Sequence, residues 1–510
     1  MSDEYPGGSV GRDDPRYEAL RRGFNLRWVG DPDSIALPGS ADQVREIVQS
    51  AVDSGRRITV RSGGHCYEDF AVGNEDGVIV DMAAMNGAYF DEDRGAYCVE
   101  SGATLWNVIW TFYKLYDRAL PTGSCYSVGA GGHISGGGYG LLARKYGLII
   151  DWLTAVDIVT VDSDRRAQVT IAEKDGAAAN LFWACQGGGG GNYGIITRFW
   201  FKDIPPAPAE AHLVNLAWDW DGMTPEEFAE IVRRYGNFFK WNSAPGGHYD
   251  GLFALLHLTH RTAGGQIVLT AQYVDGDPWP LTEFTTWMTA EGVRAPVGQR
   301  APVALNFFPH PTTSPQCLPW LYATQSLDGS GPNRRGKYKS AYMNEPFPED
   351  QIGTMWRFLT DGLNNGQALV QVDSYGGAVN ALASDATAIP QRSSIMKLQY
   401  QAYWTDPADG DSNLAWIRGL YDAMYGAAGP VPDGVMDGCY VNYPDVDLPD
   451  WQYLYYQGNY PRLQQVKAEW DPLDIFNHAQ SVELPPLPAR DGRRQFTGGR
   501  GRLAIRGGDG

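Results

Sequence analysis

Arg61-Ser62-Gly63-Gly64-His65 and Gly123-Ser124-Cys125 are two short glycine-containing stretches that place a histidine and a cysteine at the rims of tight loops. A longer stretch follows, Gly129-Ala130-Gly131-Gly132-His133-Ile134-Ser135-Gly136-Gly137-Gly138-Tyr139-Gly140. Loops this rich in glycine let backbone N–H groups approach a phosphate closely. The added imidazole and thiol indicate a cofactor that is both cradled by the backbone and held covalently.

A further glycine-rich stretch, at residues 187–194, also lies in the first 200 residues. None of these stretches contains the G-x-x-x-x-G-K-[ST] pattern, which excludes a P-loop. None opens a helix as G-x-G-x-x-G with an acidic residue about 20 positions later, so a nicotinamide Rossmann site is poorly supported. Repeated glycine stretches favour a pyrophosphate cradle over ordinary turns.

The composition is that of a globular protein with a large core. The chain has 510 residues, of which 43% are hydrophobic and 20% charged, and a formal net charge of −19. Phosphate binding needs a basic surface, so we expect no nucleic acid and no membrane as partner. The start is acidic and lacks an apolar region, so no signal peptide is expected, and a reducing cytoplasm is the default location.

The cysteines and histidines predict no metal site. Six cysteines in a chain of this length, without a C-x-x-C pair, make neither a disulfide scaffold nor a structural zinc site. His257 and His260 could lie near each other, but on an extended segment they would point to opposite faces.

Apolar spacing in the first 200 residues predicts alternating strands and helices. Ser40 is the expected N-cap of a helix running to about Asp53, and a second helix is expected over 104–116. Strands are expected at 57–60, 77–81 and 155–161. This alternation describes an α/β first domain.

The pattern changes near residues 204–209, where three prolines in four positions indicate a domain boundary. Thr224-Pro225-Glu226-Glu227 is a capping box that opens a helix. Residues 396–404 alternate apolar and polar, which predicts a strand with one solvent-facing side, and 266–274 and 369–372 are similar. We therefore expect an antiparallel sheet with helices on one side, and a mobile tail from about Arg490.

Further motifs stand in a fixed order along the chain. They are the run at 60–65, the Trp-Ala-Cys-Gln-Gly run at 183–197, Asn459-Tyr460-Pro461-Arg462-Leu463, and a final segment with Asp471-Pro472, Phe476 and Gln480-Ser481-Val482. From about residue 25 to 482 the chain resembles the berberine bridge enzyme-like FAD oxidases of the vanillyl alcohol oxidase-type superfamily. Within them it is most similar to actinobacterial natural-product tailoring oxidases, and next to hexose and oligosaccharide oxidases.

The resemblance implies an α+β, two-domain fold: a PCMH-type FAD-binding domain and an antiparallel-sheet substrate domain. Residues 1–205 would form the FAD-binding domain and 206–439 the substrate-binding domain. Residues 440–482 would return to the FAD-binding domain, and 483–510 would be a disordered tail.

The resemblance also implies FAD bonded twice, through His65 to the 8α carbon and through Cys125 to C6 of the ring. A thiolate is the attacking form, so we expect the pKa of Cys125 to be lowered by surrounding backbone N–H groups. Cys66 replaces a serine common in the family, with no large effect expected. The other residues expected to bind the cofactor are Arg61, Ser62, Gly63, Gly64, Val128, Gly129, Gly132, His133, Gly136, Gly137, Tyr139, Gly140, Gly191, Asn192, Gly194, Ile195, Asn459 and Tyr460.

Two of these positions carry specific roles in the family. His133 matches a histidine that hydrogen-bonds near flavin N1 and stabilises the reduced ring. Val128 matches a small gatekeeper associated with oxygen access, which predicts an oxidase.

The catalytic base is expected to be Tyr443, in the run Cys439-Tyr440-Val441-Asn442-Tyr443, with Tyr375 and Tyr139 as supporting tyrosines. A free tyrosine has a pKa near 10, so a second tyrosine or a cation must lower it, or proton removal must be concerted with hydride loss. The expected reaction oxidises a secondary alcohol or hemiacetal on a polyketide or glycosylated natural product to a ketone or lactone, with O2 reduced to H2O2.

Other functions stay open at this point. A carbohydrate oxidase making sugar lactones is the main alternative, followed by oxidative cyclisation or desaturation. A non-catalytic flavin- or aromatic-ligand-binding protein is a different class, against which Tyr443, His133 and Val128 argue together. The expected partners are a small-molecule substrate and O2, with a homodimer possible.

Overall fold

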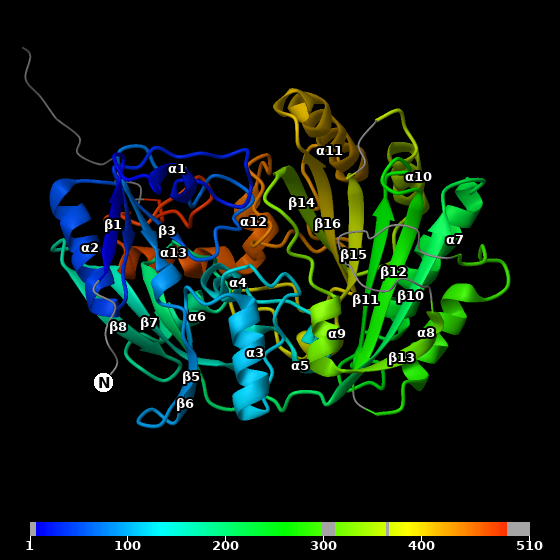
Figure 1. Cartoon of the computed structure of the whole chain (residues 1–510), viewed down its shortest axis with the longest axis horizontal. Helices are drawn as coiled ribbons and strands as arrows, with labels where there is room; N and C mark the ends of the chain where they lie inside the picture. The colour runs from blue at the N-terminus through cyan, green and yellow to red at the C-terminus, as the bar shows by residue number, and fades with distance from the viewer. Residues whose placement is uncertain (1–6, 275, 298–311, 364–366, 487–510) are drawn as a thin grey trace, which may run out of the picture.

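The computed structural model describes residues 7–274, 276–297, 312–363 and 367–486. Two lobes lie side by side in Figure 1, one built on two sheets and the other on one large sheet. Within the described residues, no helix has both the length and the hydropathy needed to cross a bilayer.

The first lobe contains two sheets. The four-stranded sheet has the order β1-β2-β4-β3, with β1 (Gly8–Gly11), β2 (Ser34–Leu37), β3 (Ile58–Arg61) and β4 (Val78–Asp81). The five-stranded sheet has the order β5-β6-β9-β7-β8, with β5 (Ala88–Asp91), β6 (Ala96–Glu100), β7 (Leu153–Val161), β8 (Ala167–Glu173) and β9 (Ile195–Phe201). Parallel pairing joins β2, β4 and β3, whereas the pairs of the five-stranded sheet are antiparallel. The prediction of an α/β first domain was therefore wrong for this sheet, because antiparallel partners need no helical crossover.

Local sequence signals set the helices of this lobe. In α2 (Ala41–Ser54), the Ser40 side chain accepts a hydrogen bond from the N–H of Gln43, and the helix ends at Gly55 in the left-handed region. Thr104 caps α3 (Leu105–Tyr116) in the same way, accepting from Asn107. The remaining helices of the first 200 residues are α1 (Tyr17–Leu20), α4 (Ala130–Ser135), α5 (Ala143–Tyr146) and α6 (Ala179–Cys185).

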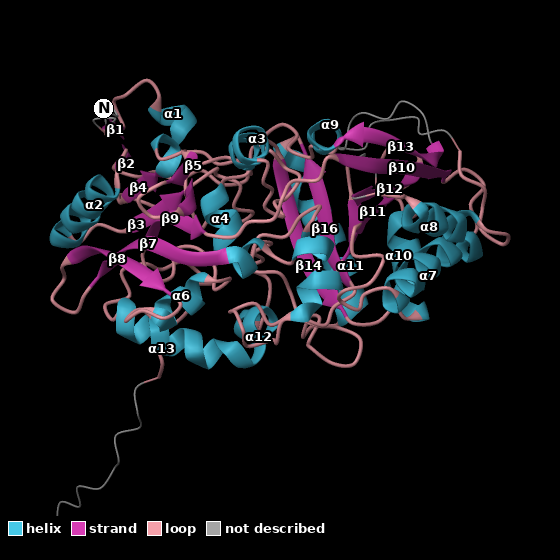
Figure 2. Cartoon of the chain, turned by 90° about the horizontal axis from the view of Figure 1, so that it is seen from below, coloured by secondary structure: helices cyan, strands magenta, loops and turns pink. Residues whose placement is uncertain are grey.

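The second lobe is a seven-stranded sheet whose paired strands are antiparallel, with the order β13-β10-β12-β11-β15-β16-β14. The strands are β10 (Glu210–Asp219), β11 (Leu252–Thr259), β12 (Gln266–Val274), β13 (Thr312–Pro319), β14 (Arg335–Met343), β15 (Leu369–Ser374) and β16 (Met396–Trp404). Figure 2 shows helices gathered along one side of the sheet: α7 (Pro225–Trp241), α8 (Trp279–Thr289), α10 (Glu349–Leu359) and α11 (Gly410–Tyr425). The short α9 (Trp320–Ser326) follows β13. The capping box that opens α7 is present, with Thr224 and Glu227 exchanging hydrogen bonds.

The polar side of β16 is not solvent-facing, so that prediction was wrong. Lys397, Gln399 and Gln401 are 0%, 5% and 6% exposed. The alternation identifies the two faces of the strand, but the first lobe covers the polar one. These side chains therefore face the space between the lobes.

The chain then returns to the first lobe through α12 (Trp451–Tyr456) and α13 (Tyr460–Trp470). The buried Lys467 donates hydrogen bonds to the carbonyl of Asn192 at 2.8 Å and to Asp471 at 2.7 Å. These bonds fasten the C-terminal helices beside the 187–194 glycine stretch. The tail expected from Arg490 lies outside the described residues.

Candidate active site

A cavity of about 1070 Å³ lies between the lobes. The glycine-rich stretches line one side, and side chains from β11, β14, β15 and β16 line the other. Pockets that hold one drug-sized ligand measure about 300–1,000 Å³. The cavity is therefore large enough for a cofactor and a substrate together.

Two of the glycine stretches touch each other at the cavity wall. A Cβ added at Gly63 would lie 2.2 Å from the backbone nitrogen of Gly129, so only glycine permits this approach. At Gly132, on the first turns of α4, an added Cβ would meet no described atom within 4 Å, because the position faces the cavity. Closely approached backbone with open space beside it fits a dinucleotide that lies across the stretches.

His65 and Cys125 lie on loops that contact each other. Ser127, two residues beyond Cys125, hydrogen-bonds through Oγ to Nε2 of His65 at 3.0 Å. The His65 ring also stacks on Phe24, with ring centroids 4.2 Å apart. Burial lowers the pKa of His65 to about 4, so its imidazole is neutral near pH 7, which is the nucleophilic form. The neutral imidazole and the contact between the two loops fit an FAD that lies along this wall.

The surroundings of Cys125 do not favour the expected thiolate. Burial, followed by the charges of Asp328 and Asp373, raises the pKa of Cys125 to about 12. Backbone N–H groups do not offset the loss of solvation, so the prediction of a lowered pKa was wrong. The neighbouring Cys66 also lines the cavity, and its burial raises its pKa to about 12.

His133 lies on α4 at the cavity wall. The backbone N–H of Gly123 donates to its Nε2 at 3.1 Å, so the proton of the neutral ring sits on Nδ1. Burial and then the charge of Lys397 lower its pKa to about 4.

Most of the residues expected to bind the cofactor line the cavity: Arg61, Ser62, Gly63, Gly64, His65, Cys66, Cys125, Val128, Gly129, Gly132, His133, Tyr139, Gly140, Gly191, Asn192, Gly194 and Ile195. Gly136, Gly137, Asn459 and Tyr460 do not line it. Asn459 donates instead to the carbonyl of Ser384 at 2.8 Å, and the Tyr460 hydroxyl accepts from the N–H of Glu483 at 3.1 Å. These contacts fix the chain around the cavity.

The three candidate tyrosines differ in where their hydroxyls lie. Tyr443 lines the cavity, and its oxygen accepts a hydrogen bond from Nζ of Lys397 at 3.0 Å. The ring of Tyr139 lines the cavity, but its hydroxyl donates to the carbonyl of Ser374. Tyr375 does not line the cavity, and its hydroxyl donates to the carbonyl of Gln391 at 3.2 Å.

The cation expected near the base is therefore present, but its effect is offset. Lys397 is also 2.6 Å from Oδ2 of Asp373, in a fully buried ion pair. Burial, followed by the charge of Asp373, raises the pKa of Tyr443 well above its usual value. The surrounding side chains therefore raise the pKa of Tyr443 and do not lower it.

A polar network connected to Tyr443 through Lys397 and Asp373 was not among the predicted site residues. Gln371 donates to Asp373 at 2.7 Å, and Gln401 donates to Gln371 at 3.2 Å and to Gln399 at 3.0 Å. Gln399 then donates to the hydroxyl of Tyr67 at 2.7 Å. The period-two pattern of 396–404 placed two of these residues, Gln399 and Gln401, on one face and was the signal that could have found them.

The two histidines weighed as metal ligands do not converge. His257 lies on the cavity side and hydrogen-bonds through Nε2 to Gln371 at 3.1 Å. His260 pairs through Nε2 with Asp361 at 3.1 Å.

Two family descriptions match the chain: "FAD binding domain" over residues 32–166 and "Berberine and berberine like" over residues 439–483. The aclacinomycin-N/aclacinomycin-A oxidase of Streptomyces galilaeus is 40% identical over 93% of this chain and 90% of its own length. The hexose oxidase of Chondrus crispus is 37% identical over 94% of this chain and 95% of its own length.

The solved structure of a glycopeptide hexose oxidase complexed with teicoplanin superposes with a TM-score of 0.87 at 35% identity. The match covers 94% of this chain and 99% of that one. The expected α+β fold, with an FAD-binding domain and an antiparallel-sheet domain, is confirmed. With full-length relatives at this identity, the chain belongs to the berberine bridge enzyme-like family of FAD-linked oxidases.

Proposed function

We propose that this oxidase converts a secondary alcohol or hemiacetal of a polyketide or glycosylated natural product into a ketone or lactone, with O2 reduced to H2O2. The observation that carries the proposal is the position of Tyr443. Its hydroxyl lies at the cavity wall beside a buried ammonium group, below a sheet face lined with amide side chains. A hydroxyl-bearing substrate finds both a base and hydrogen-bonding partners there.

FAD is attached in this proposal through His65 and Cys125. The neutral imidazole supports the first bond, and the contact between the two loops supports attachment at one edge of the ring. Acid precipitation should leave the yellow colour with the protein pellet. Cys125→Ala should keep a singly attached flavin with a changed spectrum, and free flavin in the supernatant of the wild-type protein would contradict the proposal.

Bound FAD supplies the two-electron acceptor that takes hydride from the carbinol carbon and is reoxidised by O2. Tyr443 removes the hydroxyl proton, and Lys397 stabilises the tyrosinate by donating to its oxygen at 3.0 Å. The donor hydrogen of Lys397 occupies one side of that oxygen, so the remaining lone pair serves the substrate.

A substrate deuterated at the carbinol carbon tests this chemistry. The proposal requires a primary isotope effect on anaerobic flavin bleaching, because the C–H bond breaks in that step. Equal bleaching rates for the two isotopologues would count against hydride transfer.

A carbohydrate oxidase is the second candidate, and the amide-lined sheet face favours it. Gln371, Gln399 and Gln401 offer donors and acceptors suited to sugar hydroxyls. The two similar relatives divide in the same way, one named for aclacinomycin and one for hexose. Peroxide release across a panel of free sugars and glycosylated aromatics separates the candidates by their kcat/KM values.

A further inference from the structure

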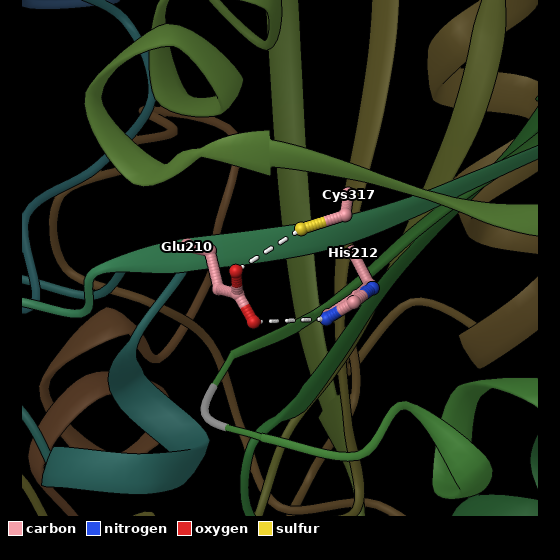
Figure 3. A group of neighbouring side chains, drawn as sticks. All are labelled: Glu210, His212 and Cys317. Carbon is pink, nitrogen blue, oxygen red and sulfur yellow. Dashed lines mark hydrogen bonds and ion pairs between the residues drawn. The ribbon is translucent and has the colours of Figure 1, made fainter.

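Three side chains with metal-ligand chemistry meet at one edge of the seven-stranded sheet, away from the cavity. Glu210 and His212 lie two positions apart on β10, so their side chains share a face. Cys317, on the edge strand β13, is the direct pairing partner of His212. Figure 3 shows the three side chains pointing toward one another.

Their ligand atoms are spaced for a single ion. Sγ of Cys317 lies 3.2 Å from one oxygen of Glu210, and Nε2 of His212 lies 3.5 Å from the other. All the ligand atoms lie within 4.8 Å of one another. A tetrahedral zinc ion with bonds of about 2.0–2.3 Å separates its ligands by roughly 3.3–3.7 Å, so small side-chain adjustments bring these three into place.

The histidine nitrogen that faces the cluster is buried and poorly paired. His212 is only 9% exposed, and its Nε2 makes no hydrogen bond among the described residues, although a Glu210 oxygen lies 3.5 Å away in an ion-pair contact. A buried nitrogen without a hydrogen bond is costly, and coordination of a cation removes that cost.

The site lies on the face of the sheet opposite the cavity. Asn215 of β10 pairs with Thr270, which pairs with Leu255, and Leu255 lines the cavity. Glu210 and His212 are odd numbers of positions from Asn215, so they project from the other face. An ion bound on this face would be separated from the cavity by the sheet and would not meet the substrate. It would instead link the edge strand β13 to its neighbour β10.

We propose that Glu210, His212 and Cys317 bind one zinc ion that fastens β13 to β10, with water in the fourth position. Thiolate, imidazole and carboxylate are all zinc ligands, and a thiolate disfavours magnesium and calcium. Binding replaces the thiol proton by the metal, so one proton is released for each ion bound.

The absence of a C-x-x-C pair predicted no metal site, whereas the ligands proposed here are brought together by strand pairing.

The test uses the FAD-loaded enzyme, stripped of metal and titrated with Zn²⁺ against a chromophoric chelator. Wild type should bind one ion per chain. Cys317→Ser should weaken Zn²⁺ binding by more than about 100-fold, because replacing a residue that only hydrogen-bonds to a metal ligand already weakens binding by roughly 10–100-fold. His248→Gln, at an exposed histidine, is the matched control and should bind as wild type does. Equal binding by wild type and Cys317→Ser would overturn the proposal.

Thiol labelling gives a readout that does not depend on affinity. Cys317 is the exposed cysteine of the six, so a thiol reagent reports on it first. Stoichiometric Zn²⁺ should slow its labelling at least tenfold in wild type and not in His212→Gln. Without metal, Glu210→Gln should speed labelling, because the neighbouring charge is gone. Labelling that is indifferent to Zn²⁺ in wild type would also overturn the proposal.

Discussion

Replacing Lys397 by methionine should slow substrate oxidation while leaving the flavin in place. The ammonium group is fully buried, 2.6 Å from Asp373 and 3.0 Å from the oxygen of Tyr443. Its removal leaves the tyrosinate without its cation and next to an unpaired carboxylate. Both changes oppose removal of the substrate proton.

The magnitude follows from the 3.0 Å separation. Two unit charges at that distance in an effective dielectric of about 20 attract by about 5.5 kcal/mol, which caps the effect near 10⁴-fold in rate. Positioned general bases contribute roughly 10²–10⁴-fold. We therefore expect Lys397→Met to slow anaerobic flavin reduction by about 10³-fold at pH 7.

Asp373→Asn should shift the pH dependence of flavin reduction in the direction opposite to that of Lys397→Met. The Asp373 charge raises the pKa of Tyr443, so its removal lowers that pKa. The tyrosinate then forms at lower pH, and the alkaline rise in the rate of flavin reduction moves to lower pH. Stopped-flow reduction over a pH series measures both variants.

Stability has to be separated from catalysis in this test. Removing one partner of a buried ion pair costs about 3–5 kcal/mol of unfolding free energy. The double variant Lys397→Met/Asp373→Leu removes both charges and should regain stability without regaining rate. A Lys397→Met enzyme with the wild-type rate and pH profile would refute the assigned role of the lysine.

Three further changes test other parts of the structure. Gly132→Val places a side chain in open cavity space and should lower the flavin content per chain several-fold. The control Gly353→Ala, at an exposed helix position, should keep the wild-type flavin content. Equal flavin absorbance per chain in the two variants would contradict the role of the glycine stretches in holding the cofactor. Tyr443→Phe should slow flavin reduction by about 10²–10⁴-fold and Tyr375→Phe by less than tenfold, because only the Tyr443 hydroxyl lies at the cavity. A larger loss for Tyr375→Phe would assign the base to Tyr375 instead. Burial favours a raised pKa for Asp447, but its arginine and lysine partners hold that pKa below the usual 3.8. Its stabilisation is thus complete above about pH 4 and fades in acid, so Asp447→Asn should lose about 2 kcal/mol at pH 7 and show a shrinking deficit in unfolding near pH 2.

The sequence predicted well wherever a local signal sets the structure. Caps located α2 and α7, apolar spacing located α3, and the glycine stretches located the cavity wall. The alternation in β16 separated its faces but not their surroundings, since burial of Lys397 depends on a lobe far away in sequence. Tyr375 stands beside active-site residues in sequence, yet the backbone turns its hydroxyl toward Gln391.

A buried ion cluster explains how the two lobes hold the aromatic wall of the site in one geometry. Lys337 of β14 contacts Glu68 at 2.5 Å and Asp445 at 2.6 Å, with all three side chains about 1% exposed. Each charge stands one or two positions from a cavity-lining tyrosine: Tyr338, Tyr67 and Tyr443.

Those rings are stacked, with the centroids of Tyr67 and Tyr338 3.5 Å apart and those of Tyr67 and Tyr443 5.5 Å apart. Separating the lobes would expose the ring stack to water and part Lys337 from Glu68 and Asp445. The ion cluster therefore couples correct docking of the lobes to the position of the base, which independent packing of each lobe would not do.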